Sequence, residues 1–277
     1  MWEKRSKQTF AFATVLSALL MMQMILYAYQ MVCQGTFGFS MYGACHSFLK
    51  QAGLSAVAIM LDVLILFTLM SLFYHLGKQV LLYKRFSHKL ELIKDHDESS
   101  RLEERFGMKV SVIPSPDPAA FTAGFLKPVI VLSSGLLQLL NEKELEAVIY
   151  HEQFHQLQKD PLKKCILQFI AGTLWYIPIF KWWKKHYELS KEVLADRWAI
   201  QATGGIADLS HALLKMMKHG KKQRSSFTVS INQTAINYRI MHLLDPETSE
   251  PVKTPRSVVI ASVQVVLVIA GMFIISP

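Results

Sequence analysis

Long apolar runs alternate with polar stretches along this 277-residue chain. Three of the runs, residues 10–32, 54–76 and 258–275, have the composition of membrane-spanning helices, which need about 20 mostly apolar residues to cross the hydrocarbon core. The first run follows a basic tail, as the apolar part of a signal peptide would. No small-residue cleavage site follows its apolar centre, so we expect a retained membrane anchor.

The apolar runs are shorter in the middle of the chain. Residues 109–113, 121–124 and 129–132 are short apolar or alternating runs separated by prolines, which predicts a small β-sheet. From Asn141 onward the apolar positions follow a helical period, and Asn141 itself is a good N-cap with Glu144 in the first turn. The sequence therefore predicts a sheet followed by a helix, and the charged run 84–105 before them predicts a solvated juxtamembrane helix.

A fourth apolar stretch covers about residues 165–180. It is short for a span, it is interrupted by Gly172 and Pro178, and lysines flank both of its ends. We expect a re-entrant or buried hairpin that returns the chain to the side from which it came.

The charge of the chain bears on its location. The formal net charge is +9 and 51% of the residues are hydrophobic. The basic residues lie beside the apolar runs without a nucleic-acid recognition motif, so we expect membrane lipid as a partner and no direct nucleic acid. Basic residues are dense in the N-terminal tail and after the second run, whereas the loop between the first two runs has only Lys50. This asymmetry predicts a multi-pass protein of the cell membrane with residues 77–256 in the cytoplasm.

The expected fold is an α+β membrane protein with about three transmembrane helices and the re-entrant hairpin. Its parts would be a two-span membrane hairpin at residues 1–76, a cytoplasmic domain at 77–256 and a C-terminal transmembrane helix at 257–277.

Two features of the first part bear on its packing. Cys33 and Cys45 fall in the outer loop, where a disulfide and two free thiols are both open interpretations. Asp62 lies near the middle of the second span, where a helix–helix hydrogen bond is the favoured role and a signalling path is the alternative.

The strongest chemical motif is the HExxH sequence at residues 151–155. His151 and His155 are four residues apart, so on a helix they project from one face and can hold a single zinc ion. Glu152 lies beside them, in the position of a general base for peptide hydrolysis.

A catalytic zinc site needs a third protein ligand. Glu192 and Asp196 are four apart on a second predicted helix, and we assign Glu192 as the ligand and Asp196 as the acceptor that orients a ligand histidine. Glu188, one turn earlier, is the alternative ligand.

These motifs together resemble the membrane metallopeptidases of the beta-lactam sensor-transducer type, peptidase family M56. The resemblance covers about residues 120–196 well, and its motifs are residues 121–125, 127–132, the HExxH helix ending in Asp160-Pro161, 175–178 and 192–196. It implies a gluzincin-like zinc peptidase that cleaves a cytoplasmic protein such as a transcriptional repressor, with self-cleavage as a preceding step.

The sequence departs from that family at several positions. Leu174 and Ile177 stand where the family usually has His and Asn, and Ala195 stands where it often has cysteine. No penicillin-binding sensor domain and no Ser-x-x-Lys nucleophile motif follow, so antibiotic sensing is not carried over. The alternatives are a quality-control or prenyl-protein protease of family M48 and a catalytically silent membrane receptor that kept the zinc fold.

Other residues have candidate roles in binding and cleavage. We expect Phe121, Thr122, Ala123 and Gly124 to form an edge strand that holds an extended peptide substrate by main-chain hydrogen bonds, and a strand that only packs on the active-site helix is the alternative. His186 and Tyr187 are positional candidates for a second oxyanion donor, although a membrane-interface role is the favoured interpretation of both. The bond Ser226–Phe227, in a polar segment at 219–230, is a candidate self-cleavage site, and an inert loop that joins the zinc domain to the last span is the favoured alternative.

Overall fold

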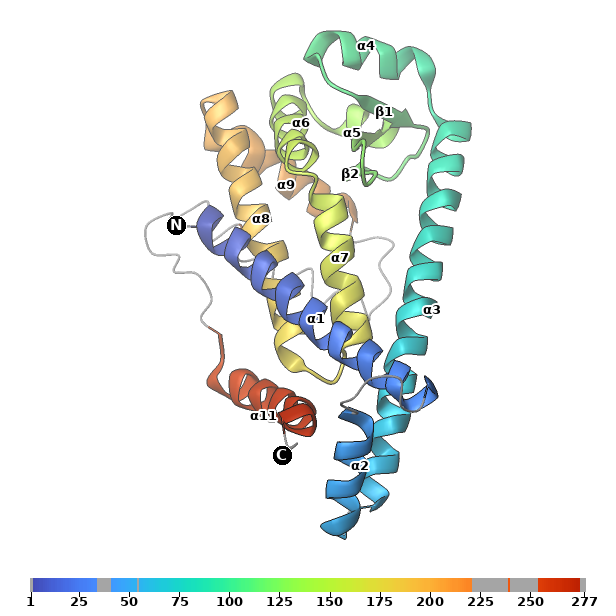
Figure 1. The fold of residues 1–277 in the computed structure, drawn as a ribbon. Coiled ribbons are helices and arrows are strands. Elements are labelled where there is room, and N and C mark those ends of the chain that lie inside the picture. The colour runs from blue at the N-terminus through green and yellow to red at the C-terminus, as the bar shows by residue number, and fades with distance from the viewer. Residues whose placement is uncertain (1, 34–40, 54, 221–238, 240–253, 275–277) are drawn as a thin grey trace. The chain divides into compact units, whose positions relative to one another are not determined.

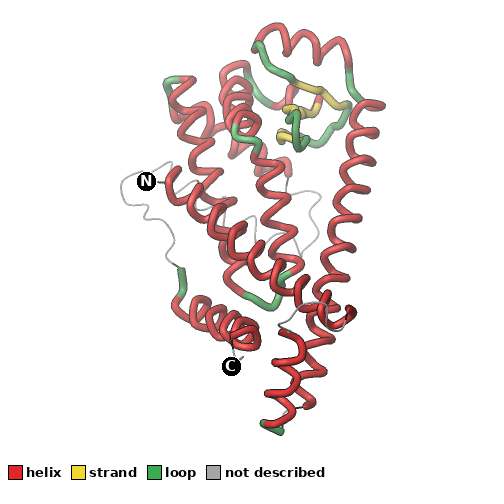
Figure 2. Tube along the Cα trace, in the orientation of Figure 1, coloured by secondary structure: helices red, strands yellow, loops and turns green. Residues whose placement is uncertain are grey.

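The computed structural model describes residues 2–33, 41–53, 55–220, 239 and 254–274. These residues are mostly helical, with one small sheet (Figure 2). The chain divides into two compact units, which we describe separately. The sheet unit contains Met1–Ser6, Leu81–Cys165 and His186–Val252, and the helical unit contains Lys7–Val80, Ile166–Lys185 and Lys253–Pro277.

The sheet has three strands in the order β1-β3-β2. β1 (Val110–Ile113) pairs in parallel with β3 (Val129–Ser133), and β2 (Ala120–Ala123) pairs antiparallel with the other side of β3. The predicted small sheet is therefore confirmed, and β2 is its outer strand. Gly124 follows β2 with φ of +101°, where an added Cβ would lie 2.8 Å from the Lys127 carbonyl oxygen, so only glycine fits this turn.

Helices surround this sheet within the sheet unit (Figure 1). α4 (His96–Phe106) packs on β1, and α5 (Ser134–Leu139) packs on β3. α6 (Glu142–Leu157) packs on β2, β3 and α9 (Ile206–Gly220). Buried side chains of these elements, among them Val112, Leu132 and Ile149, form one hydrophobic core that holds the HExxH helix against the sheet.

The start of α6 follows from its sequence. The Asn141 side chain accepts from the Glu144 backbone N–H, and the Glu144 carboxylate accepts from the Asn141 N–H, which completes a capping box. After α6 the chain bends at Lys159, whose φ of 51° is left-handed, and α7 (Asp160–Thr173) begins at the next residue. Pro161 is favourable in the first turn of α7 because its missing N–H has no helical partner there.

Among the described residues, two helices are long and apolar enough to cross a membrane, and their apolar parts lie mostly in the helical unit. They are α1 (Trp2–Cys33), with its apolar part at Trp2–Val32, and α3 (Ser55–Ile93). α3 extends well past the predicted span and ends at Ile93. Asp95 then caps the next helix, α4. α11 (Arg256–Ile274) matches the third predicted span in position, but its described apolar segment Arg256–Ile269 is shorter, so that span stays a prediction.

Asp62 on α3 makes the predicted helix–helix contact. The Tyr27 hydroxyl of α1 donates to Asp62 Oδ1 at 2.7 Å, and His46 Nε2 of α2 (Met41–Gln51) lies 3.0 Å from Oδ2. A carboxylate among apolar helices is thus hydrogen-bonded on both oxygens, as the cost of burying it requires.

The segment at 165–180 forms a helical hairpin. α7 ends at Thr173, the chain turns, and α8 (Pro178–Thr203) begins at Pro178. The Tyr176 hydroxyl lies 3.3 Å from Thr68 Oγ1, and the Ile179 N–H donates to Ser262 Oγ at 2.9 Å, so the tip is fastened to α3 and α11 inside the helical unit. The side chains of Cys33 and Cys45, and the segment with Ser226 and Phe227, lie outside the described residues.

Candidate metal centre

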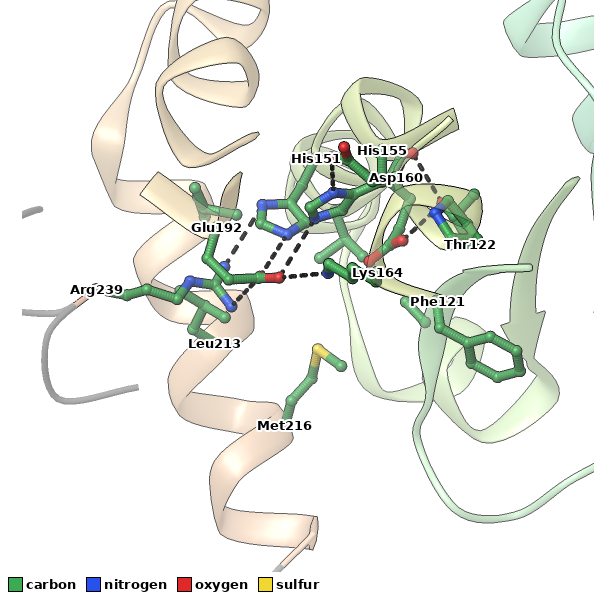
Figure 3. A pocket seen from close by; sticks show the side chains of 15 residues that line it. Phe121, Thr122, His151, His155, Asp160, Lys164, Glu192, Leu213, Met216 and Arg239 are labelled. Carbon is green, nitrogen blue, oxygen red and sulfur yellow. Dashed lines mark hydrogen bonds and ion pairs between the residues drawn. The ribbon is translucent and has the colours of Figure 1, made fainter. Parts of the chain in front are cut away.

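Three side chains from α6 and α8 converge in the sheet unit (Figure 3). His151, His155 and Glu192 each offer a ligand atom, and these atoms all lie within 4.8 Å of one another. Nε2 of His151 is 3.4 Å from Glu192 Oε2, and Nε2 of His155 is 3.6 Å from Glu192 Oε1. The four-residue spacing on α6 places the two imidazoles on one helix face, and the α7–α8 hairpin brings Glu192 opposite them.

The other ring nitrogen of each histidine has a carboxylate partner. His151 Nδ1 is 2.9 Å from Asp196 Oδ1, and His155 Nδ1 is 2.9 Å from Asp160 Oδ2. A carboxylate at Nδ1 holds the proton there, so in the neutral rings the Nε2 lone pairs point toward Glu192. Two imidazole nitrogens and one carboxylate are a ligand set that zinc accepts, so these residues fit a zinc ion.

Asp160 is a functional candidate that sequence reasoning missed, because Asp160-Pro161 was interpreted only as a helix boundary. It is fully buried, and besides His155 it accepts from the Tyr187 hydroxyl at 3.0 Å and lies 3.3 Å from Lys191 Nζ. Burial alone would raise the pKa of Asp160, but His155, Lys191 and Tyr187 outweigh it and lower that pKa, so the group stays ionised. A carboxylate five residues after the motif, just beyond a helix end, is the signal that could have identified it.

The positional candidates for an oxyanion donor lie elsewhere. His186 and Tyr187 are buried, and neither is among the described residues that line the cavity at the candidate metal centre. The Tyr187 hydroxyl is engaged by Asp160. The structure thus places the Tyr187 hydroxyl on Asp160, the carboxylate that contacts His155, and neither candidate lines the cavity within the described residues.

Two basic side chains from outside the HExxH motif, Arg239 and Lys164, contact the acidic residues of the site. Arg239 donates through Nε and Nη2 to the two oxygens of Asp196, at 2.8 and 2.5 Å, and its Nη1 lies 3.4 Å from Glu192 Oε2. Lys164, in the second turn of α7, donates to Glu192 Oε1 at 3.0 Å. Burial alone would raise the pKa of Glu192, but Lys164 and the two histidines outweigh it and hold that pKa well below its usual value.

Without a metal, a proton on His151 takes part in the same network. Burial and the charge of Arg239 lower the pKa of His151, but its hydrogen bonds to Asp196 and Glu192 outweigh them and raise it to about 9. Because a metal can bind only the deprotonated ring, a metal ion must displace this proton.

Glu152 lies next to the three converging side chains and is held by β2. The Thr122 hydroxyl lies 2.8 Å from Glu152 Oε2 and 2.9 Å from the Glu152 backbone oxygen. Thr122, together with Ala120 and Phe121, also lines the cavity of about 290 Å³ at this centre, whereas Ala123 and Gly124 are not among its described lining residues. One part of the predicted edge strand therefore faces the site, and the other leads into the turn.

The remaining cavity walls are apolar. Leu209, Leu213 and Met216 of α9 line the cavity with Val148 of α6. Figure 3 shows Leu213 and Met216 beside the converging polar side chains. Glu188, the alternative third ligand, belongs neither to the metal-ligand group nor to the cavity lining among the described residues. The geometry favours Glu192.

Comparison with known proteins identifies the class of protein. The sequence model of the family described as BlaR1 peptidase M56 matches residues 7–243, which is most of the chain. The chain therefore belongs to the BlaR1-type peptidase family M56, a family of membrane metallopeptidases, as its motifs predict.

Individual relatives are named as proteases or as a regulatory protein. The chain is 25% identical over 193 residues to a Protease HtpX homolog of Pelotomaculum thermopropionicum, covering 55% of this chain and 67% of that protein. It is 22% identical over 175 residues to the Regulatory protein BlaR1 of Bacillus licheniformis, covering 61% and 29%. A Protease HtpX homolog of Pyrococcus abyssi is 36% identical over 77 residues, or 27% of each chain. The chain thus spans about two thirds of the first relative and less than a third of the other two.

Proposed function

We propose that this protein is a zinc metalloendopeptidase of the cell membrane that cleaves a cytoplasmic protein or a peptide bond close to the membrane. The observation that supports this most strongly is the convergence of His151, His155 and Glu192 within 4.8 Å beside Glu152. The carboxylate partners at both histidine Nδ1 atoms add to it, because they hold the rings in the orientation and tautomer that a metal needs.

The proposed reaction is hydrolysis of a peptide bond. When bound, zinc would supply positive charge that polarises the scissile carbonyl and acidifies the attacking water. Glu152 takes one proton from that water as oxygen adds to the carbonyl carbon, and it gives the proton to the amide nitrogen as the C–N bond breaks. Thr122 fixes the Glu152 carboxylate in place during both transfers, because its hydroxyl can donate to Oε2.

Substrate binding is proposed at β2. The outer strand of a sheet can pair with an extended peptide through its free main-chain groups, and Ala120 to Thr122 face the cavity. Leu213 and Met216 supply an apolar wall for a side chain of the peptide. A transcriptional repressor in a signalling pathway is the proposed natural substrate, and a relative named Regulatory protein BlaR1 supports a regulatory role.

A second candidate is membrane quality control or prenyl-protein processing by an M48-type protease, and relatives whose names say protease, without a regulatory role, are consistent with it. The two candidates differ in what is cut. We expect a comparison of proteomes from cells with the native chain and with Glu152→Ala to yield one regulatory substrate in the first case and many membrane proteins in the second. Equal proteomes would speak against both, and for a catalytically silent receptor.

The direct test is peptide hydrolysis by the purified full chain in detergent. We expect β-casein to be cleaved when zinc is present, and cleavage to fall by at least about a thousandfold in Glu152→Gln, because the proton carrier is lost. Zinc content of the variant should match that of the native protein. Equal rates in the two proteins would contradict the proposed function.

A further inference from the structure

Lys164 places an ammonium group inside the candidate metal centre. Its side chain is 32% exposed and lines the cavity together with Glu152 and Glu192. Among the described residues, the Glu192 carboxylate is the one group in hydrogen-bond contact with the ammonium, at 3.0 Å. An ammonium has three donors, so two of them are left for water or for a ligand in the cavity.

The other side-chain donors that line the cavity, outside the candidate ligands, already have partners. Thr122 contacts Glu152 through its single hydroxyl, and Arg239 grips both oxygens of Asp196 while a third nitrogen approaches Glu192. Arg239 is also only 12% exposed. Of the side-chain donors that line the cavity outside the candidate ligands within the described residues, Lys164 has spare hydrogens and is more exposed than Arg239.

The contact with Glu192 places Lys164 in competition with a metal. Glu192 Oε1 is shared between Lys164 Nζ at 3.0 Å and His155 Nε2 at 3.6 Å. A metal ion held by these ligands would draw on the same carboxylate charge, and a nearby ammonium repels a dication. Lys164 therefore lowers the affinity of these ligands for a metal ion.

We propose that Lys164 is a catalytic residue that donates a hydrogen bond to the scissile carbonyl oxygen as this oxygen gains negative charge, and that it does so at the expense of metal affinity. This inference rests on the proposed function and names the second oxyanion donor of that site. A donor already fixed in a partly dry cavity stabilises the developing charge without reorganisation.

The two roles predict opposite effects of one substitution. In Lys164→Met, kcat should fall about a hundredfold or more with a small change in KM, because one oxyanion donor is lost. Zinc affinity should rise by about tenfold, because a like charge is removed and Glu192 Oε1 is released. A lysine that only supported the fold would lower both quantities when it is replaced.

The experiment uses the full chain in detergent and measures two quantities for each variant. Zinc affinity is measured by competition with a chromogenic chelator, and hydrolysis is measured with β-casein. Lys164→Arg, which keeps the charge, should retain zinc affinity within about threefold and most of the activity. Lys163→Met removes a neighbouring charge that does not line the cavity and should leave both quantities unchanged within about twofold.

Tighter zinc binding with slower hydrolysis in Lys164→Met supports the proposal. Unchanged kcat overturns it, and so does weaker zinc binding, provided that the thermal unfolding midpoint shows the variant to be folded. If Lys164→Met does not fold, Lys164→Gln takes its place with the same expected signs. If the native protein cleaves no casein, the proposed function fails, and the zinc affinities alone then decide whether Lys164 competes for Glu192.

Discussion

At the scale of single residues, the candidate metal centre consists of two matched pairs. His151 with Asp196 and His155 with Asp160 each join a ring to a buried carboxylate at 2.9 Å, and each carboxylate is in turn held by a cation, Arg239 or Lys191. Sequence reasoning assigned one of these carboxylates and missed the other. Arg239 follows His151 by 88 residues, and no local pattern could connect them.

The first prediction concerns the ligands. His151→Ala, His155→Ala and Glu192→Ala should each lower zinc content well below about one ion per chain, since catalytic zinc needs all three protein ligands. Zinc would be measured by plasma emission after purification. Glu188→Ala is the matched control on the same helix and should keep its zinc. Retention in Glu192→Ala with loss in Glu188→Ala would transfer the ligand role to Glu188.

A second prediction concerns Thr122, whose hydroxyl contacts the Glu152 carboxylate at 2.8 Å. Thr122→Val keeps the shape of the side chain and removes the donor, so kcat for casein should fall about tenfold, the effect of losing one hydrogen bond to a charged group. Thr122→Ser restores the hydroxyl and should recover most of the rate. Equal losses in the two variants would mean that the methyl group of Thr122, not its hydroxyl, is what matters.

At the scale of elements, the sequence predicted the parts that depend on local signals. The strands follow from short apolar runs between prolines, and the start of α6 follows from Asn141 and Glu144. The end of α3 was not predictable in this way, because polar residues form a helix as readily as apolar ones when a neighbouring turn already exists. Asp95, the N-cap of α4, is the local signal that marks the boundary between the two helices.

The third prediction concerns the contact between α6 and α9. Glu144 is buried, and its Oε2 accepts from Lys215 at 2.7 Å and from the Asn141 N–H at 2.9 Å. Glu144→Gln should lower the free energy of unfolding by about 1 kcal/mol at neutral pH, a modest value because Lys215 is 40% exposed. Glu142→Gln, which disrupts an exposed pair with Arg105, is the control and should change it little.

The same contact predicts a pH dependence. Burial alone would raise the pKa of Glu144, but the hydrogen bonds from Lys215 and Asn141 outweigh it and lower that pKa below its usual value. A carboxyl group with a lowered folded pKa stabilises the protein above its unfolded pKa, and this contribution is lost as the pH falls through the folded value. The difference in melting temperature between the native chain and Glu144→Gln should therefore shrink below about pH 4.5. A constant difference from pH 3 to pH 7 would contradict this assignment.

At the scale of the whole molecule, orientation in the membrane decides which compartment the candidate metal centre faces. We propose a multi-pass protein with its catalytic part, residues 77–256, in the cytoplasm, supported by the basic residues around α1 and after the apolar part of α3. The helical hairpin of α7 and α8 supports the proposal too. It brings Glu192 back to His151 and His155, so these three residues are proposed to lie on one side of the membrane.

The fourth prediction tests this topology in a background with Cys33, Cys45 and Cys165 replaced by serine. Single cysteines at Lys94 and at Lys218 should both be shielded from an impermeant thiol reagent in intact cells, and both should react after permeabilisation. A cysteine at Lys50, in the proposed outer loop, should react in intact cells. Labelling of only one of the first two would place His151 and Glu192 on opposite sides and contradict the zinc proposal.

The bend at Lys159 has a consequence for which mutations the protein can accept. The number of residues between His155 and Asp160 fixes the direction in which Asp160 points. One residue added to or removed from a helix rotates everything beyond it by about 100°. Asp160 would then lose His155, whatever the inserted residue. In a library selected for activity, we expect length changes between residues 156 and 159 to disappear, while Lys159→Gly survives, because glycine adopts a φ near 51° without strain. Here spacing, more than side-chain identity, limits how the sequence can diverge.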